Sequence, residues 1–335
     1  AVFDTDRAPH RARAGVRTVV SGAAPQLEPR WRTLGVARRI GYALLPGDTF
    51  SYVLHLRPRE WPIMVAHTSI GFIIAIGARA FVRGDRIGAY LIMLLSWVGC
   101  LNAGTLALNS AFDRDEGDIG YLDAPPPIPR HLALVSLALM TVGQLVALTL
   151  GTGFAIAYAI CFAMSIAYSV PPVRLKAVAG ADWAINIIGV GVLTPFAGWS
   201  ASGFAQRAEA GWIMIGFGCL FGSLYPLTQI YQFDEDSSRG DRTLARIFGV
   251  RASLLISAIA AGLAFAAFSH GLLLAGPTEM SRNALVVSGA GWLAVLGDWI
   301  VRQRRMTSAD HQRGMYRALA AWALTDVAMV IAFAL

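Results

Sequence analysis

The chain has 335 residues, of which 56% are hydrophobic and only 15% charged, and its mean hydropathy is +0.54. This balance excludes an ordinary soluble domain, because one water-soluble core cannot bury so much apolar surface. A net charge of +7 would suit a nucleic-acid partner. The basic residues do not gather into one soluble module, however, so we expect no nucleic acid to bind.

Long apolar runs recur along the chain after residue 60. A membrane-crossing helix needs about 20 mostly apolar residues. The sequence predicts nine such segments, at residues 62–78, 88–108, 131–150, 154–169, 183–200, 212–231, 250–269, 284–301 and 316–334. Continuous runs such as Leu132 to Leu150 lack the alternation of barrel strands. We therefore predict an all-α membrane protein with about nine transmembrane helices in a single bundle.

The first 49 residues differ from the rest of the chain. They contain scattered arginines and no apolar core of a secretory signal, so we expect a basic, partly mobile cytoplasmic tail. Within it, residues 31–45 place Trp31, Leu34, Ile40 and Leu44 among arginines. This piece is predicted to be either an amphipathic helix on the membrane surface or an ordinary solvated tail. Residues 50–335 are expected to form the transmembrane domain.

The basic residues sort by membrane side. If the N-terminus is cytoplasmic, that side holds 23 of the 28 Lys and Arg, and the other side holds only Arg79, Arg83, Arg86, Arg207 and Arg282. Such a bias follows the positive-inside rule. We therefore expect an integral protein of a bacterial cytoplasmic membrane, with its N-terminus and the loops after the second, fourth and sixth spans in the cytoplasm.

Nine of the 21 acidic residues lie in two of these cytoplasmic loops, namely Asp113, Asp115, Glu116, Asp118 and Asp123 in one and Asp234, Glu235, Asp236 and Asp241 in the other. Carboxylates this close repel one another unless a cation neutralises them. A hard divalent cation with oxygen ligands is suited to this role. A single solvated acidic loop would be unremarkable, but two at equivalent positions favour a metal site.

A basic loop lies between the two acidic ones. It runs from Tyr168 to Lys176, contains a double proline that cannot continue a helix, and ends with Arg174 and the only lysine of the chain. Arg and Lys can hold phosphate oxygens that a magnesium ion leaves free. These three loops, at the mouth of an apolar bundle, indicate a site for a metal-bridged phosphate head with an apolar tail.

Three stretches resemble the signatures of the UbiA superfamily of intramembrane prenyltransferases, at residues 109–118, 168–176 and 234–244. Leu56-Arg57-Pro58 with Trp61, and the stretch from Gly189 to Trp199, are also similar to that family. The resemblance covers roughly residues 50–335. It implies a helical bundle with cytoplasmic active-site loops that holds a prenyl diphosphate, binds Mg²⁺ through two acidic motifs and transfers the prenyl group to an aromatic or lipid acceptor.

The resemblance also implies roles for single residues. Asn109 and Asp113 match the first motif, and Asp236 matches the second. The chain departs from the family pattern at Ser110, Gly117 and Gln232, where acids are usual, and nearby acids are expected to take their place. The implied metal ligands are Asn109, Asp113, Asp115, Asp118, Asp234 and Asp236. The implied catalytic residues are Asp113, Asp236, Arg174 and Lys176. The implied substrate-binding residues are Arg57, Asn109, Tyr168, Arg174, Lys176, Tyr231 and Arg239.

Three functions fit these features, and a Mg²⁺-dependent intramembrane prenyltransferase ranks first. The absence of acids at Ser110 and Gln232 leaves open a terpene cyclase of the same superfamily, in which the prenyl cation reacts with its own chain. A secondary transporter is the third, and it is disfavoured because its ionisable residues would lie near the bilayer midplane rather than in loops at one face. The acceptor and the prenyl length are not encoded in any motif.

Overall fold

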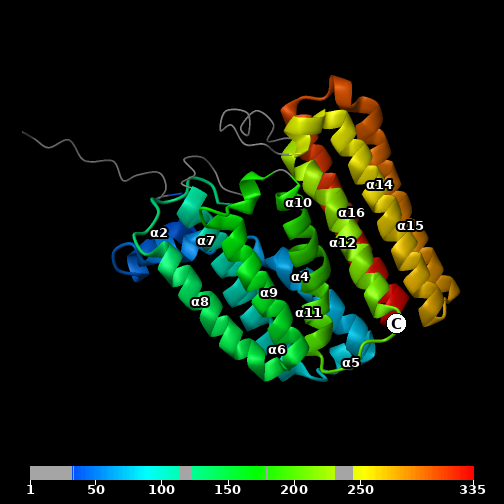
Figure 1. Cartoon of the computed structure of the whole chain (residues 1–335), viewed down its shortest axis with the longest axis horizontal. Coiled ribbons are helices and arrows are strands. Elements are labelled where there is room, and N and C mark those ends of the chain that lie inside the picture. The colour runs from blue at the N-terminus through cyan, green and yellow to red at the C-terminus, as the bar shows by residue number, and fades with distance from the viewer. Residues whose placement is uncertain (1–31, 33, 114–121, 179, 231–243) are drawn as a thin grey trace, which may run out of the picture.

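The computed structural model describes residue 32 and residues 34–113, 122–178, 180–230 and 244–335, and their regular structure is helical (Figure 1). The first half comprises α2 (Val36–Leu44), α3 (Thr49–His55), α4 (Trp61–Ile76), α5 (Ala78–Val82), α6 (Ile87–Leu94), the π-helix η1 (Leu95–Asn102), α7 (Ala103–Asp113), α8 (Leu132–Ala147), η2 (Leu148–Leu150) and α9 (Thr152–Ser169). The second half comprises η3 (Leu175–Ala177), α10 (Ala181–Asn186), the π-helix η4 (Ile187–Leu193), α11 (Thr194–Ala201), α12 (Ala210–Ile230), α14 (Leu244–Ala275), α15 (Glu279–Arg302), η5 (Gln303–Arg305) and α16 (Ser308–Phe333).

Most of these helices are long enough to cross a membrane. Eight helical segments in the described chain have the length and hydropathy of a membrane span, and the sixth is kinked at Gly249: Ile87–Asp113, Leu132–Leu150, Thr152–Ser169, Ala181–Ala201, Ala210–Ile230, Arg246–Ala275, Glu279–Arg305 and Ser308–Phe333. A further apolar helix, α4, has 16 residues. The prediction of an all-α membrane protein is therefore confirmed, and eight long helices plus one short one account for the nine predicted segments.

Some helix ends differ from the sequence-based prediction because local backbone chemistry decides them. α4 ends at Ile76 because Gly77 adopts φ +85°, a conformation that glycine accommodates readily. α16 begins at Ser308, not at residue 316, because Thr307 and Asp310 form a capping box around its first turn. Hydropathy alone misses such polar helix starts. As a result, this helix extends the bundle beyond the apolar core.

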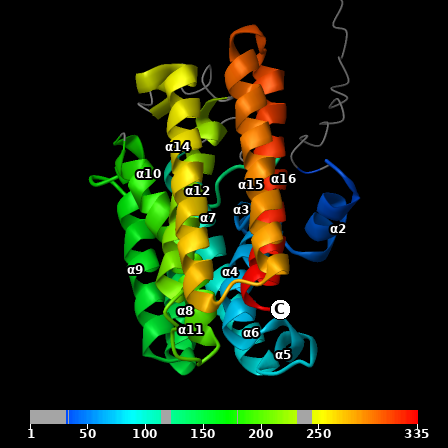
Figure 2. The same cartoon turned by 90° about the vertical axis from the view of Figure 1, so that its right-hand side faces the viewer.

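The bundle has two apolar cores that meet at α4 and α11. One joins α12, α14, α15 and α16 around Phe217, Phe268 and Trp292, and the other joins η1, α8 and α9 around Trp97 and Tyr158. Figure 1 shows the helices of the two cores side by side, and Figure 2, turned by 90°, shows α14 and α15 in front. α4 and α11 approach closely because glycines face the other helix's backbone: a Cβ on Gly71 would overlap the Pro195 carbonyl, and one on Gly198 the Thr68 carbonyl.

The C-terminal end of the chain and the loop after α9 lie at opposite ends of the bundle. The Ala78 amide donates to the Ala334 carbonyl at 3.0 Å, which holds the C-terminus beside α5 (Figure 1). The end of α7, the loop after α9 and the start of α10 meet at the opposite end. The basic loop therefore lies beside the first acidic motif, as the sequence predicted.

Candidate active site

The first acidic motif and the basic loop meet through four residues, which we call the polar cluster: Asn109, Asp113, Arg174 and Lys176. Asn109 and Asp113 are four residues apart on α7 and so share one helical face. After α9, Arg174 adopts a left-handed backbone (φ +35°), and the short helix η3 that follows carries Lys176. The double proline ends α9 and thereby turns the basic side chains toward α7.

The contacts of the polar cluster are charge-assisted and largely shielded from water. The Lys176 ammonium pairs with the Asp113 carboxylate and donates to Asn109 Oδ1 at 2.8 Å. Arg174 Nη2 lies 3.3 Å from Asp113 Oδ1. The side chains of Asp113 and Lys176 are only 14% and 11% exposed, whereas that of Arg174 is 40% exposed. Charged groups interact more strongly where solvent screening is weak, so the cluster is a preorganised electrostatic site.

Arg57 contacts the residue at position 110, which follows Asn109 on α7. Arg57 is 8% exposed, has φ +51°, and donates to Ser110 Oγ at 3.1 Å. It also pairs with Glu60 at 3.6 Å. The side chain at position 110 is thus a hydroxyl that accepts a hydrogen bond from the Arg57 guanidinium. Ser110 therefore binds Arg57 and supplies no carboxylate.

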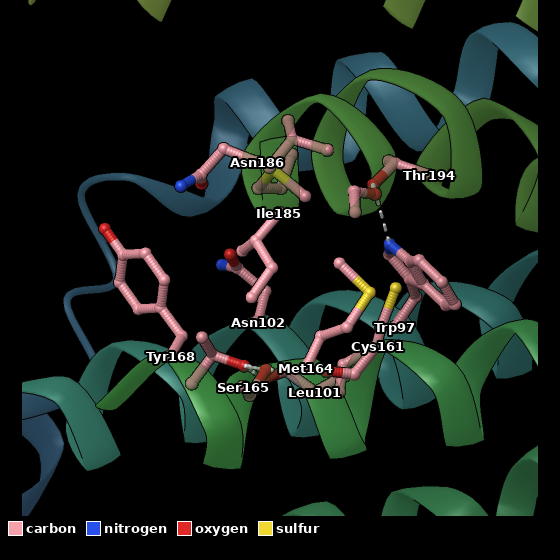
Figure 3. A pocket seen from close by; sticks show the side chains of 14 residues that line it. Trp97, Leu101, Asn102, Cys161, Met164, Ser165, Tyr168, Ile185, Asn186 and Thr194 are labelled. Carbon is pink, nitrogen blue, oxygen red and sulfur yellow. Dashed lines mark hydrogen bonds between the residues drawn. The ribbon is translucent and has the colours of Figure 1, made fainter. Parts of the chain in front are cut away.

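A mostly apolar cavity of about 120 Å³ lies inside the bundle, close to the polar cluster (Figure 3). The lining side chains come from α4, η1, α7, α9, α10, η4 and α11: Met64, Trp97, Leu101, Asn102, Thr105, Cys161, Met164, Ser165, Tyr168, Ile185, Asn186, Gly189, Val190 and Thr194. Thr105 precedes Asn109 by about one helical turn on α7. Tyr168 precedes Ser169, whose hydroxyl donates to Asn109 Oδ1 at 3.4 Å. An apolar cavity that is lined by a few polar groups and lies close to a charged cluster is typical of a ligand site.

Two π-helical segments line the same cavity. η1 contributes Trp97, Leu101 and Asn102, and η4 contributes Gly189 and Val190. π-helical turns within longer helices are frequent at functional sites. The buried Asn102 Nδ2 has no hydrogen-bond partner among the described residues, and its side chain lies among the lining residues in Figure 3. An unpaired buried amide is costly, so a ligand group is suited to complete it.

Sequence reasoning missed a buried carboxylate near the cavity mouth. Asp182, at the start of α10, is 2% exposed, and its Oδ2 accepts hydrogen bonds from Gln229 at 3.1 Å and from the Tyr225 hydroxyl at 3.4 Å. The Tyr225 hydroxyl also lies 3.4 Å from the Tyr168 hydroxyl. This network joins α10, α12 and α9 and orients Tyr168. An acid in the first turn of a helix after a basic loop was the available signal.

Six candidate site residues lie outside the described part of the chain: Asp115, Asp118, Tyr231, Asp234, Asp236 and Arg239. The stretch that holds four of them begins directly after α12, whose last turn contacts Asp182 through Gln229. Within the described residues, no group of three or more His, Cys, Asp or Glu side chains could hold a metal ion. The predicted ligands that the structure places together are therefore Asn109 and Asp113.

Comparisons with known proteins agree with this architecture. No curated protein matched the sequence. Among solved structures, digeranylgeranylglyceryl phosphate synthase is similar, with a TM-score of 0.66 and 13% identity over 85% of this chain and 98% of that chain. A UbiA homologue from Archaeoglobus fulgidus, bound to DMAPP and Mg²⁺, is also similar, with a TM-score of 0.62 and 19% identity over 83% of this chain and 99% of that chain.

The same homologue bound to GPP and Mg²⁺ gives a TM-score of 0.61, also at 19% identity. These likenesses confirm the fold. The sequence profile of the UbiA prenyltransferase family matches residues 64–324, which is well over half of the chain. The chain belongs to the UbiA prenyltransferase family, as its motifs predicted.

Proposed function

We propose that this protein is a Mg²⁺-dependent intramembrane prenyltransferase that moves a prenyl group from a prenyl diphosphate to a hydrophobic aromatic or lipid acceptor. One observation carries this proposal: the polar cluster lies next to an apolar cavity inside a membrane bundle, since Ser169, the neighbour of the lining residue Tyr168, donates to Asn109. A diphosphate head needs charged partners, whereas a prenyl tail needs an apolar enclosure. The polar cluster and the neighbouring cavity offer both.

The donor atoms in the cluster fit magnesium. Asn109 and Asp113 present oxygens from neighbouring turns of α7, and Mg²⁺ is usually bound through one or two carboxylates together with substrate phosphates. The A. fulgidus homologue was solved with Mg²⁺ and a prenyl diphosphate. We infer that Asp115, Asp118, Asp234 and Asp236 complete the ligand set. The metal, when bound, would stabilise negative charge on the leaving diphosphate.

The basic side chains would exchange partners when substrate binds. Lys176 and Arg174 both pair with Asp113 in the structure, so the cluster holds two positive charges and one negative charge. If a cation takes over Asp113, both basic groups become available for the phosphate oxygens. Arg57 and Arg239 are inferred to add further phosphate contacts. These groups would stabilise the transition state electrostatically, because charge accumulates on the diphosphate as it leaves.

The reaction that this arrangement supports is an allylic substitution. The bond between prenyl C1 and the diphosphate oxygen breaks, and its electron pair leaves with the diphosphate. The resulting allylic cation accepts an electron pair from the acceptor nucleophile, and the acceptor then loses a proton. The aromatic faces of Tyr168 and Tyr231 are inferred to stabilise the cation. The apolar cavity wall would limit its capture by water.

The charge distribution supports a cytoplasmic location for the polar cluster and for residues 1–49. In the described part of that segment, α2 exposes Val36, Ile40 and Leu44 on one face, at 62%, 52% and 75%. Its Arg38 donates to the carbonyl oxygens of Asp123 and Ala124, just after the first acidic motif. We infer that α2 lies on the cytoplasmic membrane surface and supports this motif.

Product analysis tests the proposed function. Purified protein would be incubated with Mg²⁺, a panel of prenyl diphosphates and a bacterial lipid extract, and the products would be identified by mass. We expect one released diphosphate for each prenylated acceptor, and loss of both products in EDTA or in Asp113→Asn. A cyclic hydrocarbon that forms without acceptor would contradict prenyl transfer. Absence of diphosphate release from every substrate would contradict both enzyme functions.

A further inference from the structure

A hydrogen bond between two side chains closes the inner end of the cavity. Trp97 Nε1 donates to Thr194 Oγ1 at 3.3 Å, and Thr194 Oγ1 donates to the Gly189 carbonyl at 2.9 Å. Figure 3 shows this pair at one end of the cavity and Tyr168 at the other. Tyr168 lies near the polar cluster. A tail that enters past Tyr168 therefore meets the Trp97 ring at the inner end.

Packing on its other side holds Trp97 in place. Its side chain is 2% exposed, and its ring centroid lies 5.7 Å from that of Phe154 and 6.1 Å from that of Tyr158. The Tyr158 hydroxyl donates to the Met140 carbonyl at 2.9 Å and so fixes the second ring. Trp97 cannot swing aside without losing these contacts and its hydrogen bond. The inner end is thus a fixed wall.

The distance from the cavity mouth to this wall limits the tail. Thr105 and Trp97 are eight residues apart in one helical segment, and because the residues up to Asn102 are π-helical and rise less per residue than an α-helix, the rise between them is at most about 12 Å. An extended isoprene unit adds four carbon–carbon bonds of about 1.5 Å and, because the chain zigzags, spans about 5 Å. About two units fill the distance between Thr105 and Trp97, and a third would collide with the indole ring.

We propose that Trp97 and Thr194 set the length of the prenyl tail by admitting a geranyl-sized chain and excluding longer ones. This inference rests on the proposed prenyl diphosphate substrate and names its size class. Trp97 would touch only the far end of the tail, so it determines specificity and takes no part in cleavage. Thr194 acts through Trp97 as a positioning residue, because its hydroxyl accepts the indole hydrogen bond.

The test compares kcat/KM for geranyl, farnesyl and geranylgeranyl diphosphate, measured as Mg²⁺-dependent diphosphate release with one acceptor extract. The variants are Trp97→Ala, which removes the wall, and Thr194→Val, which keeps its volume but loses the hydrogen bond. Trp292→Ala is the matched control. Trp292 is equally buried, at 1% exposure, and donates to Thr325 Oγ1 at 3.0 Å, but it lies in the other apolar core.

We expect the parent to prefer geranyl over geranylgeranyl diphosphate by at least about tenfold, and Trp97→Ala to reduce that ratio by at least about tenfold. Thr194→Val should reduce it less, and Trp292→Ala should leave it unchanged. Trp97→Leu replaces Trp97→Ala if the alanine variant does not fold. The inference would be overturned if the parent used geranyl and geranylgeranyl diphosphate equally well. It would also be overturned if the Trp97 and Thr194 variants kept the parental ratio of kcat/KM. A parent inactive on every diphosphate would instead contradict the proposed function.

Discussion

Substitution of Lys176 by glutamine should separate the stabilising role of the polar cluster from its role in catalysis. Lys176 bonds to both Asp113 and Asn109, and its side chain is only 11% exposed. Its loss leaves the Asp113 carboxylate with Arg174 at 3.3 Å as its remaining basic partner in the cluster. A buried carboxylate that loses its main partner destabilises the fold, so Lys176→Gln should be less stable than the parent.

The magnitude follows from the contacts that are lost. A hydrogen bond to a charged group contributes about 1.5–3 kcal/mol. Arg174 compensates in part, but its greater exposure weakens its contribution, so we expect Lys176→Gln to lose about 2 kcal/mol of stability. Asp113→Asn removes the same ion pair from the other side. The double variant should therefore lose at least about 1 kcal/mol less than the sum of the two single variants.

Reversible unfolding in mixed detergent, followed by tryptophan fluorescence, measures this double-mutant cycle. Diphosphate release measured on the same samples supplies the second readout. We expect the double variant to be more stable than the sum of the two single losses predicts. It should remain inactive, because two of the four residues of the polar cluster are replaced. Additive stability losses would show that Lys176 and Asp113 are not coupled. Parental turnover in Lys176→Gln would refute its assignment to the phosphate.

Three further variants test other parts of the structure. Asp236→Ala should lower Mg²⁺-dependent turnover at least about 100-fold, and near-parental kinetics would remove it from the ligand set. Gly71→Ala should destabilise the protein by about 1–3 kcal/mol in the same unfolding assay, because the new Cβ overlaps the Pro195 carbonyl. Gly262→Ala is the control and should not destabilise it, because its Cβ meets open space. Burial lowers the pKa of His55, so stability should fall as pH drops below the unfolded value of about 6.5, and His55→Gln should flatten that dependence.

The helices were largely predictable because membrane spans are encoded locally. α9 was expected at residues 154–169 and spans Thr152–Ser169, since an apolar run and a double proline define it. The start of α16 was not predictable from hydropathy, because a capping box extends the helix through a polar segment. The close packing of α4 against α11 depends on glycines in both helices. This packing is a tertiary feature, so the sequence of either helix alone does not predict it.

The candidate site was predictable only where a motif carried it. Asn109, Asp113, Arg174 and Lys176 were identified from the sequence, and the structure brings them together. The Asp182 network and the Trp97–Thr194 hydrogen bond were missed. Both join helices far apart in the sequence, and apart from the position of Asp182 in the first turn of α10, no local pattern distinguishes their residues from ordinary core residues. Such contacts become visible only when the helices are packed.

The most direct test of the central claim is the binding of a prenyl diphosphate at the polar cluster. Equilibrium binding of an unreactive geranyl thiolodiphosphate would be measured with Mg²⁺ for the parent, Lys176→Gln, Arg174→Gln and Arg305→Gln. Arg305 is the control, because it carries a positive charge at the helix turn η5, away from the cavity lining. We predict Mg²⁺-dependent binding that weakens at least about tenfold in the two cluster variants and is unchanged in Arg305→Gln. Equal binding by all four proteins would contradict the account.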